Sequence, residues 1–193
     1  MPEESPIIRT AGPDDFESVA RLIFRSHTVS FAPFASDDWV SSRDLDKYRD
    51  RWREALAAPG ADDQTFVALI DGDIVGSVRV APADSAEFDA QLTGMHVEPD
   101  ITGRGVGSLL MASALEFIRE QRFGRVELGV IAGNTGARRF YEAHGWTLVR
   151  MSCQWHRRRP CGDLRAEMRA NGATPREEVP TACHCEVFDT SLP

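Results

Sequence analysis

A glycine-rich segment, Thr102–Ser108, constrains the fold of this chain more than any other feature. It reads Thr-Gly-Arg-Gly-Val-Gly-Ser, follows an apolar stretch with strand character at 88–97, and opens a stretch with helical apolar spacing. A helix N-terminus presents unpaired N–H groups and a positive dipole end, and glycines let the backbone approach an anion closely. The segment therefore predicts an anion-binding turn between a strand and a helix, with a plain glycine-rich turn as the alternative.

The glycine spacing excludes two other phosphate loops. A Walker A loop needs Gly-Lys-Ser/Thr after a four-residue gap, and the sequence has none. The dinucleotide fingerprint needs G-x-G-x-x-G, whereas the glycines here stand at 103, 105 and 107. The expected ligand is therefore neither a Walker-type nucleotide nor a dinucleotide.

The rest of the pattern predicts a mixed α/β fold. Three strands in a run, with a tight hairpin turn at Asp71-Gly72-Asp73, are followed by alternating helices and strands, which favours a mixed sheet flanked by helices. Strands are expected at 7–10, 64–70, 74–80, 88–97, 125–131 and 146–151, and helices at 13–24, 45–56, 106–117 and 135–144. Residues 30–38 are expected to form a loop.

Charge and hydropathy exclude several classes of partner. The formal net charge is −8, which argues against a nucleic-acid-binding protein and would help to attract a cationic amine. The first residues are acidic without an apolar core, and no stretch is apolar over the length that spans a bilayer. We expect a cytoplasmic protein without nucleic-acid or membrane partners.

Two sequence blocks together resemble the acetyl-CoA signature of the GNAT superfamily of N-acetyltransferases. The first is Leu92–Pro99 followed by Gly103–Leu110, and the second runs from Leu128 through Asn134 to Trp146. The resemblance covers roughly residues 6–151. It implies a GNAT acetyltransferase core at 1–151 and leaves 152–193 as a cysteine-containing C-terminal extension.

The resemblance also implies cofactor contacts and a general acid. The loop amides would bind the pyrophosphate of coenzyme A; the matched residues are Thr102, Gly103, Arg104, Gly105, Val106, Gly107 and Ser108. Thr102 departs from the Gln or Arg of the family pattern, with a local hydrogen bond as its alternative role. Met95 and Val97 would pair with the pantetheine arm through their backbones, and Asn134 would lie beside it or cap a helix. Tyr141 would protonate the leaving thiolate, although it also fits a helical core stripe.

The usual general base is missing. Many relatives carry Glu where this chain has Gln91, and an amide cannot accept the amine proton. Asp89 and His96 are the candidate catalytic replacements, with a solvated acid and a packed histidine as their alternatives, and His27 is a similar candidate. A substrate amine that arrives neutral would need no base.

The C-terminal extension holds all four cysteines. Cys153, Cys161, Cys183 and Cys185, with His156 and His184 among them, can be drawn as a zinc site but match no standard spacing, so zinc is not favoured over free thiols. A helix is expected at 163–170 and a last strand at 185–188.

The predicted activity is transfer of the acetyl group of acetyl-CoA to a primary amine of a small molecule, by direct attack in a ternary complex. Loop 30–38 and the extension would shape the acceptor pocket, and the extension would carry substrate selection or homodimer contacts. A non-catalytic acyl-CoA-binding sensor is the alternative from another class.

Overall fold

The computed structural model describes residues 5–152, 165–169 and 186–190, and from residue 150 onward only their backbone. The chain forms two compact units. The first comprises Met1–Pro33, Asp37–Ala81 and Thr93–Gln121, and the second comprises Phe34–Ser36, Pro82–Leu92 and Arg122–Pro193.

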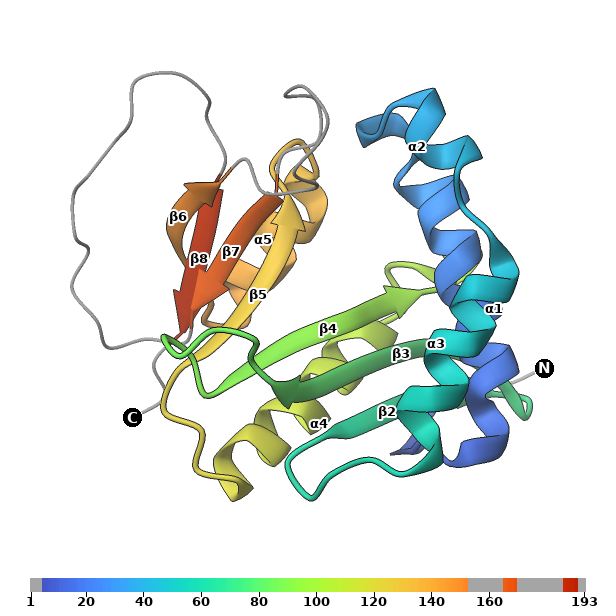
Figure 1. The fold of residues 1–193 in the computed structure, drawn as a ribbon, viewed down its shortest axis with the longest axis horizontal. Helices are drawn as coiled ribbons and strands as arrows, with labels where there is room; N and C mark the ends of the chain where they lie inside the picture. The colour runs from blue at the N-terminus through green and yellow to red at the C-terminus, as the bar shows by residue number, and fades with distance from the viewer. Residues whose placement is uncertain (1–4, 153–164, 170–185, 191–193) are drawn as a thin grey trace. The chain divides into compact units, whose positions relative to one another are not determined.

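The strands of the first unit form an antiparallel arrangement (Figure 1). They are β1 (Ile7–Thr10), β2 (Gln64–Ile70) and β3 (Asp73–Pro82), followed by the end of β4 (Ala90–Val97). β2 pairs with both β1 and β3, and the β2–β3 turn has Asp71 at φ 53° and Gly72 at φ 88°. Two successive left-handed residues define a hairpin turn whose twist suits antiparallel strands, so the turn predicted at Asp71-Gly72 is confirmed.

Helices cover both faces of these strands. The helices of the first unit are α1 (Phe16–Arg25), α2 (Asp37–Ser41), α3 (Leu45–Ala57) and α4 (Val106–Glu120), with short helical turns η1 (Pro13–Asp15), η2 (Ser26–Ser30) and η4 (Pro99–Ile101). Val67 of β2 is buried with Ile23 of α1 and Trp52 of α3. The neighbouring Phe66 instead meets Phe117 of α4, because successive strand side chains point to opposite faces.

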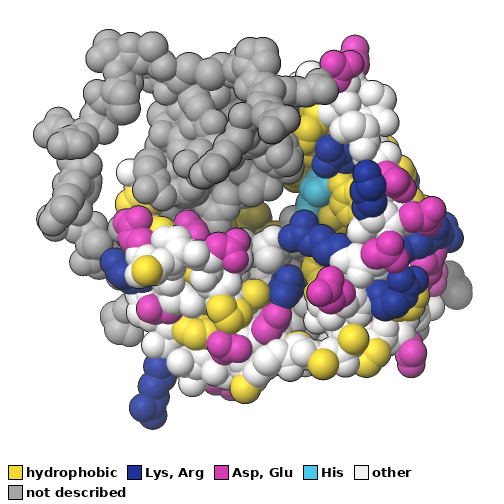
Figure 2. Space-filling model, in the orientation of Figure 1, with side chains coloured by type: hydrophobic (Ala, Val, Ile, Leu, Met, Phe, Trp, Pro, Cys, Tyr) yellow, Lys and Arg dark blue, Asp and Glu magenta, His cyan; other side chains and the backbone are white. Residues whose placement is uncertain are grey.

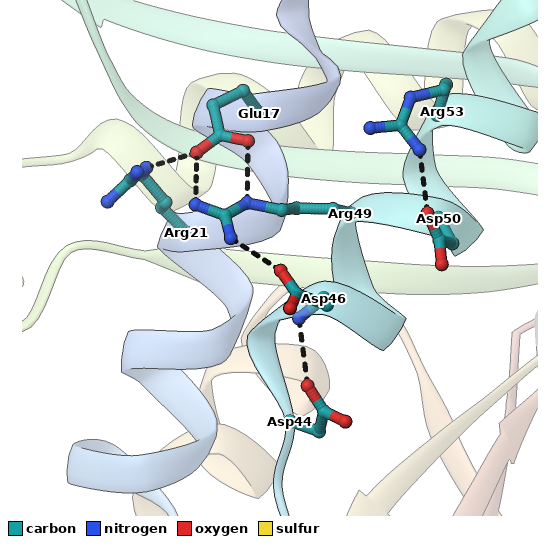
Figure 3. A network of polar contacts seen from close by, with 7 residues as sticks. All are labelled: Glu17, Arg21, Asp44, Asp46, Arg49, Asp50 and Arg53. Carbon is teal, nitrogen blue, oxygen red and sulfur yellow. Dashed lines mark hydrogen bonds and ion pairs between the residues drawn. The ribbon is translucent and has the colours of Figure 1, made fainter.

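Ion pairs join α1 to α3 at the surface (Figure 3). The Glu17 carboxylate accepts two hydrogen bonds from the Arg49 guanidinium, each 2.8 Å, and a further one from Arg21. Arg49 also donates to Asp46 at 2.6 Å, and Asp44 caps the start of α3 by accepting from the Asp46 amide. The hydrogen bond from Arg49, followed by that from Arg21, lowers the pKa of Glu17 to about 2.

The second unit contains the parallel part of the fold. Its elements are β5 (Val126–Ile131), α5 (Thr135–Ala143), β6 (Thr147–Ser152), β7 (Arg165–Arg169) and β8 (Glu186–Thr190), together with the start of β4. Ala90 to Leu92 of β4 pair in parallel with Val126 to Leu128 of β5. β7 pairs antiparallel with β5 and β6, and β8 pairs antiparallel with β6.

The mixed α/β class predicted from the sequence is confirmed, with corrections in three segments. The helix expected at 163–170 is wrong, because residues 165–169 form strand β7. β4 begins at Ala90 rather than at residue 88, so Asp89 precedes the strand. The loop expected at 30–38 contains short helices, among them η3 (Ala32–Phe34) and the start of α2.

Candidate functional site

The glycine-rich segment forms the predicted turn into a helix. Gly103 and Gly105 have φ angles of 84° and 82°, in the left-handed region that favours glycine. The helix α4 then begins at Val106, and Leu109 donates to the Gly105 carbonyl at 3.1 Å. The amides of the first helical residues therefore precede the helical hydrogen-bond ladder, as expected for the positive end of a helix. A Cβ on either glycine would meet no atom within 4 Å, so their conformation rather than crowding requires glycine.

The start of this loop is held to the end of α1. Arg25 donates to the carboxylates of Glu98 and Asp100, at 2.6 and 2.7 Å. The Thr102 hydroxyl donates to the Pro99 carbonyl at 3.0 Å, which is the local hydrogen bond given above as its alternative role. The loop thus enters the helix from an anchored turn, with Arg104 exposed between the two glycines.

The end of β4 departs from a regular strand at Gly94. This residue has φ 59°, and its carbonyl accepts a hydrogen bond from the Ser77 hydroxyl at 2.9 Å. An added Cβ would lie 3.1 Å from Cη2 of Trp52, a side chain only 5% exposed. Met95 and Val97, whose backbones are expected to contact the pantetheine arm, follow this irregularity and are half-buried.

His96, between them, is buried against the segment that follows α1. Its Nδ1 lies 2.8 Å from the Ser26 hydroxyl oxygen. Burial, and after it the neighbouring His27, lowers the pKa of His96 well below 6.5. The ring is therefore neutral near pH 7 and satisfied by a hydroxyl, which fits the packed histidine given above as its alternative.

His27 lies at the centre of an aromatic cluster. Its Nδ1 is 2.7 Å from the Tyr48 hydroxyl oxygen of α3. The rings around it include those of Phe31, Trp39, Tyr48 and His96, with centroids 4.9 to 5.6 Å away. The turn that carries His27 is the π-helix η2, in which the Phe31 amide donates to the Ser26 carbonyl at 3.0 Å. Such wide turns occur mostly as short insertions and often at functional sites.

Asp89 and Gln91 are engaged with backbone groups of the second unit. One carboxylate oxygen of Asp89 accepts from the amides of Gly124 and Arg125, at 2.7 and 2.8 Å, and so organises the turn before β5. The Gln91 side chain donates to the Pro82 carbonyl at 3.1 Å. These contacts give both side chains a structural task.

Tyr141 and Asn134 belong to α5 and its cap. The Asn134 side-chain oxygen accepts from the Ala137 amide at 3.0 Å, which is the helix-capping role. Tyr141 is 8% exposed and packs edge-on against Trp146, with ring centroids 6.4 Å apart. Burial raises the pKa of Tyr141 above its ordinary value of 10, so its hydroxyl keeps its proton at neutral pH.

The predicted site residues thus divide between the two units. The glycine-rich loop, Met95, Val97 and His96 lie in the first, whereas Asp89, Asn134 and Tyr141 lie in the second. The structure adds Tyr48 and Ser26 to the residues predicted from the sequence. The contact of Tyr48 with His27 has no local sequence signal.

Two further expectations concern metals and membranes. Among residues 5–152 and the two later strands, no group of three or more His, Cys, Asp or Glu is placed to hold a metal ion. The cysteines and histidines drawn above as a zinc site lie outside the described residues. Within the same residues, no helix is long and apolar enough to cross a membrane.

Comparison with known sequences identifies similar proteins. The sequence profile described as "Acetyltransferase (GNAT) family" matches residues 27–146. An uncharacterised N-acetyltransferase of Archaeoglobus fulgidus is 30% identical over 138 residues, which cover 69% of this chain and 88% of that protein. A mycothiol acetyltransferase of Beutenbergia cavernae is 35% identical over 85 residues, which cover 44% of this chain and 28% of that protein.

Solved structures show the same fold at low sequence identity. An N-acetyltransferase of Thermoplasma acidophilum in complex with coenzyme A has a TM-score of 0.67 at 18% identity, over 85% of this chain and 98% of that one. A putative acetyltransferase of Salmonella typhimurium with its cofactor acetyl-CoA has a TM-score of 0.67 at 15% identity, over 93% of this chain and all of that one.

Proposed function

Because this chain belongs to the GNAT family of acetyltransferases and is an acetyl-CoA-dependent N-acetyltransferase, we propose that its acceptor is a primary amine of a small molecule. The amine attacks the thioester directly, within a complex of both substrates. The C–N bond forms, the C–S bond breaks, and coenzyme A leaves as the thiol.

The geometry of the α4 N-terminus is the observation that carries the proposed acetyl-CoA site. Left-handed glycines at 103 and 105 and the helix amides from Val106 onward provide N–H donors and a positive dipole end, which suit a pyrophosphate. The proposed contacts are the backbone groups of Thr102, Gly103, Arg104, Gly105, Val106, Gly107 and Ser108. Thr102 would contribute its backbone rather than its side chain, since its hydroxyl donates a hydrogen bond to the Pro99 carbonyl.

The end of β4 is proposed to position the acetyl group. The backbones of Met95 and Val97 would pair with the extended pantetheine arm as an added strand. A backbone amide there would donate to the thioester oxygen, and a positioned donor stabilises the negative charge that develops as the amine attacks. The left-handed φ of Gly94 supports this role because it departs from regular strand geometry and so changes the direction of the backbone groups of the residues that follow.

Tyr141 is proposed as the general acid. Its hydroxyl keeps its proton at neutral pH and so has a proton to give to the departing thiolate. Asn134 caps the helix that carries Tyr141 and would lie near the cofactor arm. Asp89 and His96 remain the candidates for the base that the sequence offered, although both have the structural contacts described above.

Two observations favour a small-molecule amine. The net charge of −8 would draw a cationic acceptor toward the protein, and the relative named as a mycothiol acetyltransferase supports a small acceptor.

The lack of a carboxylate at Gln91 favours the second candidate, a non-catalytic acyl-CoA sensor. A cytoplasmic homodimer remains a prediction, and light scattering on the purified chain would measure its oligomeric state.

The test is thiol release from acetyl-CoA across a panel of small amines, with cofactor binding measured by calorimetry on the same preparation. Tyr141→Phe keeps the ring and removes the proton donor. It is expected to lower kcat by about 10²-fold or more, with little change in cofactor affinity. Binding without turnover on any amine would favour the sensor, and no cofactor binding would refute the proposed site.

A further inference from the structure

The proposed reaction needs an acceptor for the proton that the attacking amine loses, and the aromatic cluster of the first unit offers one. We infer that Tyr48 and His27 form a proton relay, in which the Tyr48 oxygen takes the amine proton while the Tyr48 proton passes to Nδ1 of His27. The inference rests on the proposed function, and it places the base on α3 and η2 rather than at residue 91.

The position of the pair fits this role. η2 directly follows α1, and its wide turn presents His27 beside His96 of β4, with ring centroids 4.9 Å apart. Residues 95 and 97 flank His96, and their backbones are the proposed contacts of the acetyl-bearing arm. His27 and Tyr48 are both half-buried, so the pair is neither sealed in the core nor fully exposed. In Figure 2 a histidine side chain reaches the surface of the molecule beside hydrophobic and basic side chains.

The relay requires one direction of the hydrogen bond within the pair. It uses the tautomer of neutral His27 that carries its proton on Nε2, so that the Tyr48 hydroxyl, whose oxygen is 2.7 Å from Nδ1, donates to the ring. A phenolic oxygen has two lone pairs, so it can receive the amine proton while its own proton is donated to Nδ1.

The surroundings determine how readily the relay takes up a proton. Burial raises the pKa of Tyr48, and Arg43 partly offsets this effect, so the hydroxyl does not ionise unaided and depends on His27 as its base. The titratable and charged groups around His27 include Tyr48 from α3 and His96 from β4, and Arg43 and Arg51 act in turn on Tyr48. His96 is neutral near pH 7 and so does not oppose the charge on His27.

The step balances without a further reactant. The amine nitrogen bonds to the acetyl carbon and loses a proton to the Tyr48 oxygen, while the Tyr48 proton moves to Nδ1 and leaves His27 as an imidazolium. The thiolate receives its proton from the proposed acid, Tyr141, and His27 later releases its proton to water. The arrangement follows the same logic as a hydroxyl paired with a histidine in nucleophilic enzymes, except that the hydroxyl here forms no covalent bond.

The experiment measures kcat/KM against pH for the full chain, using the best amine of the panel. Tyr48→Phe removes the hydroxyl and keeps the ring that packs against Phe24. His27→Asn places an amide nitrogen near Nδ1 and removes the base. His144→Asn is the matched control, because His144 is also half-buried, has Nδ1 2.7 Å from a backbone carbonyl oxygen, and is not a member of the His27–Tyr48 pair.

The relay predicts that wild type loses activity toward low pH, because a protonated histidine cannot serve as the base. Tyr48→Phe and His27→Asn should each lower kcat by about 10²-fold or more and should abolish this acidic limb, with acetyl-CoA binding retained. Because they break one relay, the double variant should lose no more than either single variant. His144→Asn should keep the wild-type profile.

Two outcomes would overturn the relay while leaving the acetyltransferase intact. One is a wild-type profile in His27→Asn or Tyr48→Phe. The other is loss of the acidic limb in His96→Asn alone, which would move the base to β4. If wild type acetylated no amine at all, the proposed function would fail together with the relay.

Discussion

Replacing Gly94 with alanine is expected to destabilise the protein through two separable effects. The first is the left-handed backbone at φ 59°, which costs an L-residue about 1–2 kcal/mol, and the loss of unfolded-state entropy returns about 0.4–1 kcal/mol. The second is contact, since the new Cβ would lie 3.1 and 3.2 Å from the Cη2 and Cζ2 atoms of Trp52. Trp52 is packed in the core and cannot yield freely, and overpacking of this kind costs about 1–3 kcal/mol.

Gly72→Ala provides the matched control. Its φ is 88°, but an added Cβ there meets no atom within 4 Å, so only the backbone effect applies. We expect a loss in the free energy of unfolding of about 1 kcal/mol for Gly72→Ala and about 2–4 kcal/mol for Gly94→Ala. Urea unfolding followed by circular dichroism measures both, and a comparison is valid where the m-values agree.

A double-mutant cycle identifies the contact. In a Trp52→Phe background the smaller ring leaves room for the methyl group, so the cost of Gly94→Ala should fall toward that of Gly72→Ala. Equal losses for the two glycine variants in the native background would refute the reasoning, because they would show that Trp52 does not resist the added Cβ.

Three further predictions concern the same unit. Glu17 stabilises the folded chain while its carboxylate is ionised, so its contribution is complete above its ordinary pKa of 4.5 and is lost as the pH falls toward its folded pKa of about 2. The free energies of unfolding of wild type and Glu17→Gln, measured with urea, should therefore converge as the pH falls from 4.5 to 2. A constant difference between them would contradict this prediction. Gly76→Ala should lower the Tm measured in a thermal melt, because the new Cβ would lie 2.9 Å from Cδ1 of Leu110 and 3.2 Å from the His96 carbonyl oxygen. Overpacking of this kind costs about 1–3 kcal/mol. An unchanged Tm would show that α4 moves aside. Gly105→Ala should weaken acetyl-CoA binding measured by calorimetry, because the backbone at the start of α4 has φ 82° at this position, which is costly for alanine. An unchanged affinity would argue against the proposed loop contacts.

Local patterns predicted the parts of the fold that depend on few residues. The glycines at 103 and 105 predicted the turn into α4, and Asp71-Gly72 predicted the hairpin, because a left-handed backbone restricts the residue type. The stretch at 163–170 failed for the opposite reason. Its Arg, Glu and Met residues favour a helix, but residues 165–169 pair with β5 and β6, and tertiary pairing overrides local preference.

The candidate site was only partly predictable. Family resemblance selected Tyr141 and the loop, but nothing in the sequence indicated that Asp89 would bind the amides of residues 124 and 125. The contact between His27 and Tyr48 joins residues 21 positions apart, on separate helical elements, and depends on a turn one residue wider than an α-helix. Such a turn has no sequence signature of its own.

The arrangement of the aromatic cluster around His27 depends on the number of residues in the π-helix η2. From Ser26 to Phe31 the backbone closes its hydrogen bond over five residues, where an α-helix would use four. Deleting one residue between His27 and Phe31 would restore ordinary winding and turn Phe31 by roughly 100° about the helix axis relative to His27. A single-residue deletion could therefore dismantle the ring cluster while every side chain that contributes to it is retained, so sequence comparisons across this family should score the length of the segment after α1 as well as its residues.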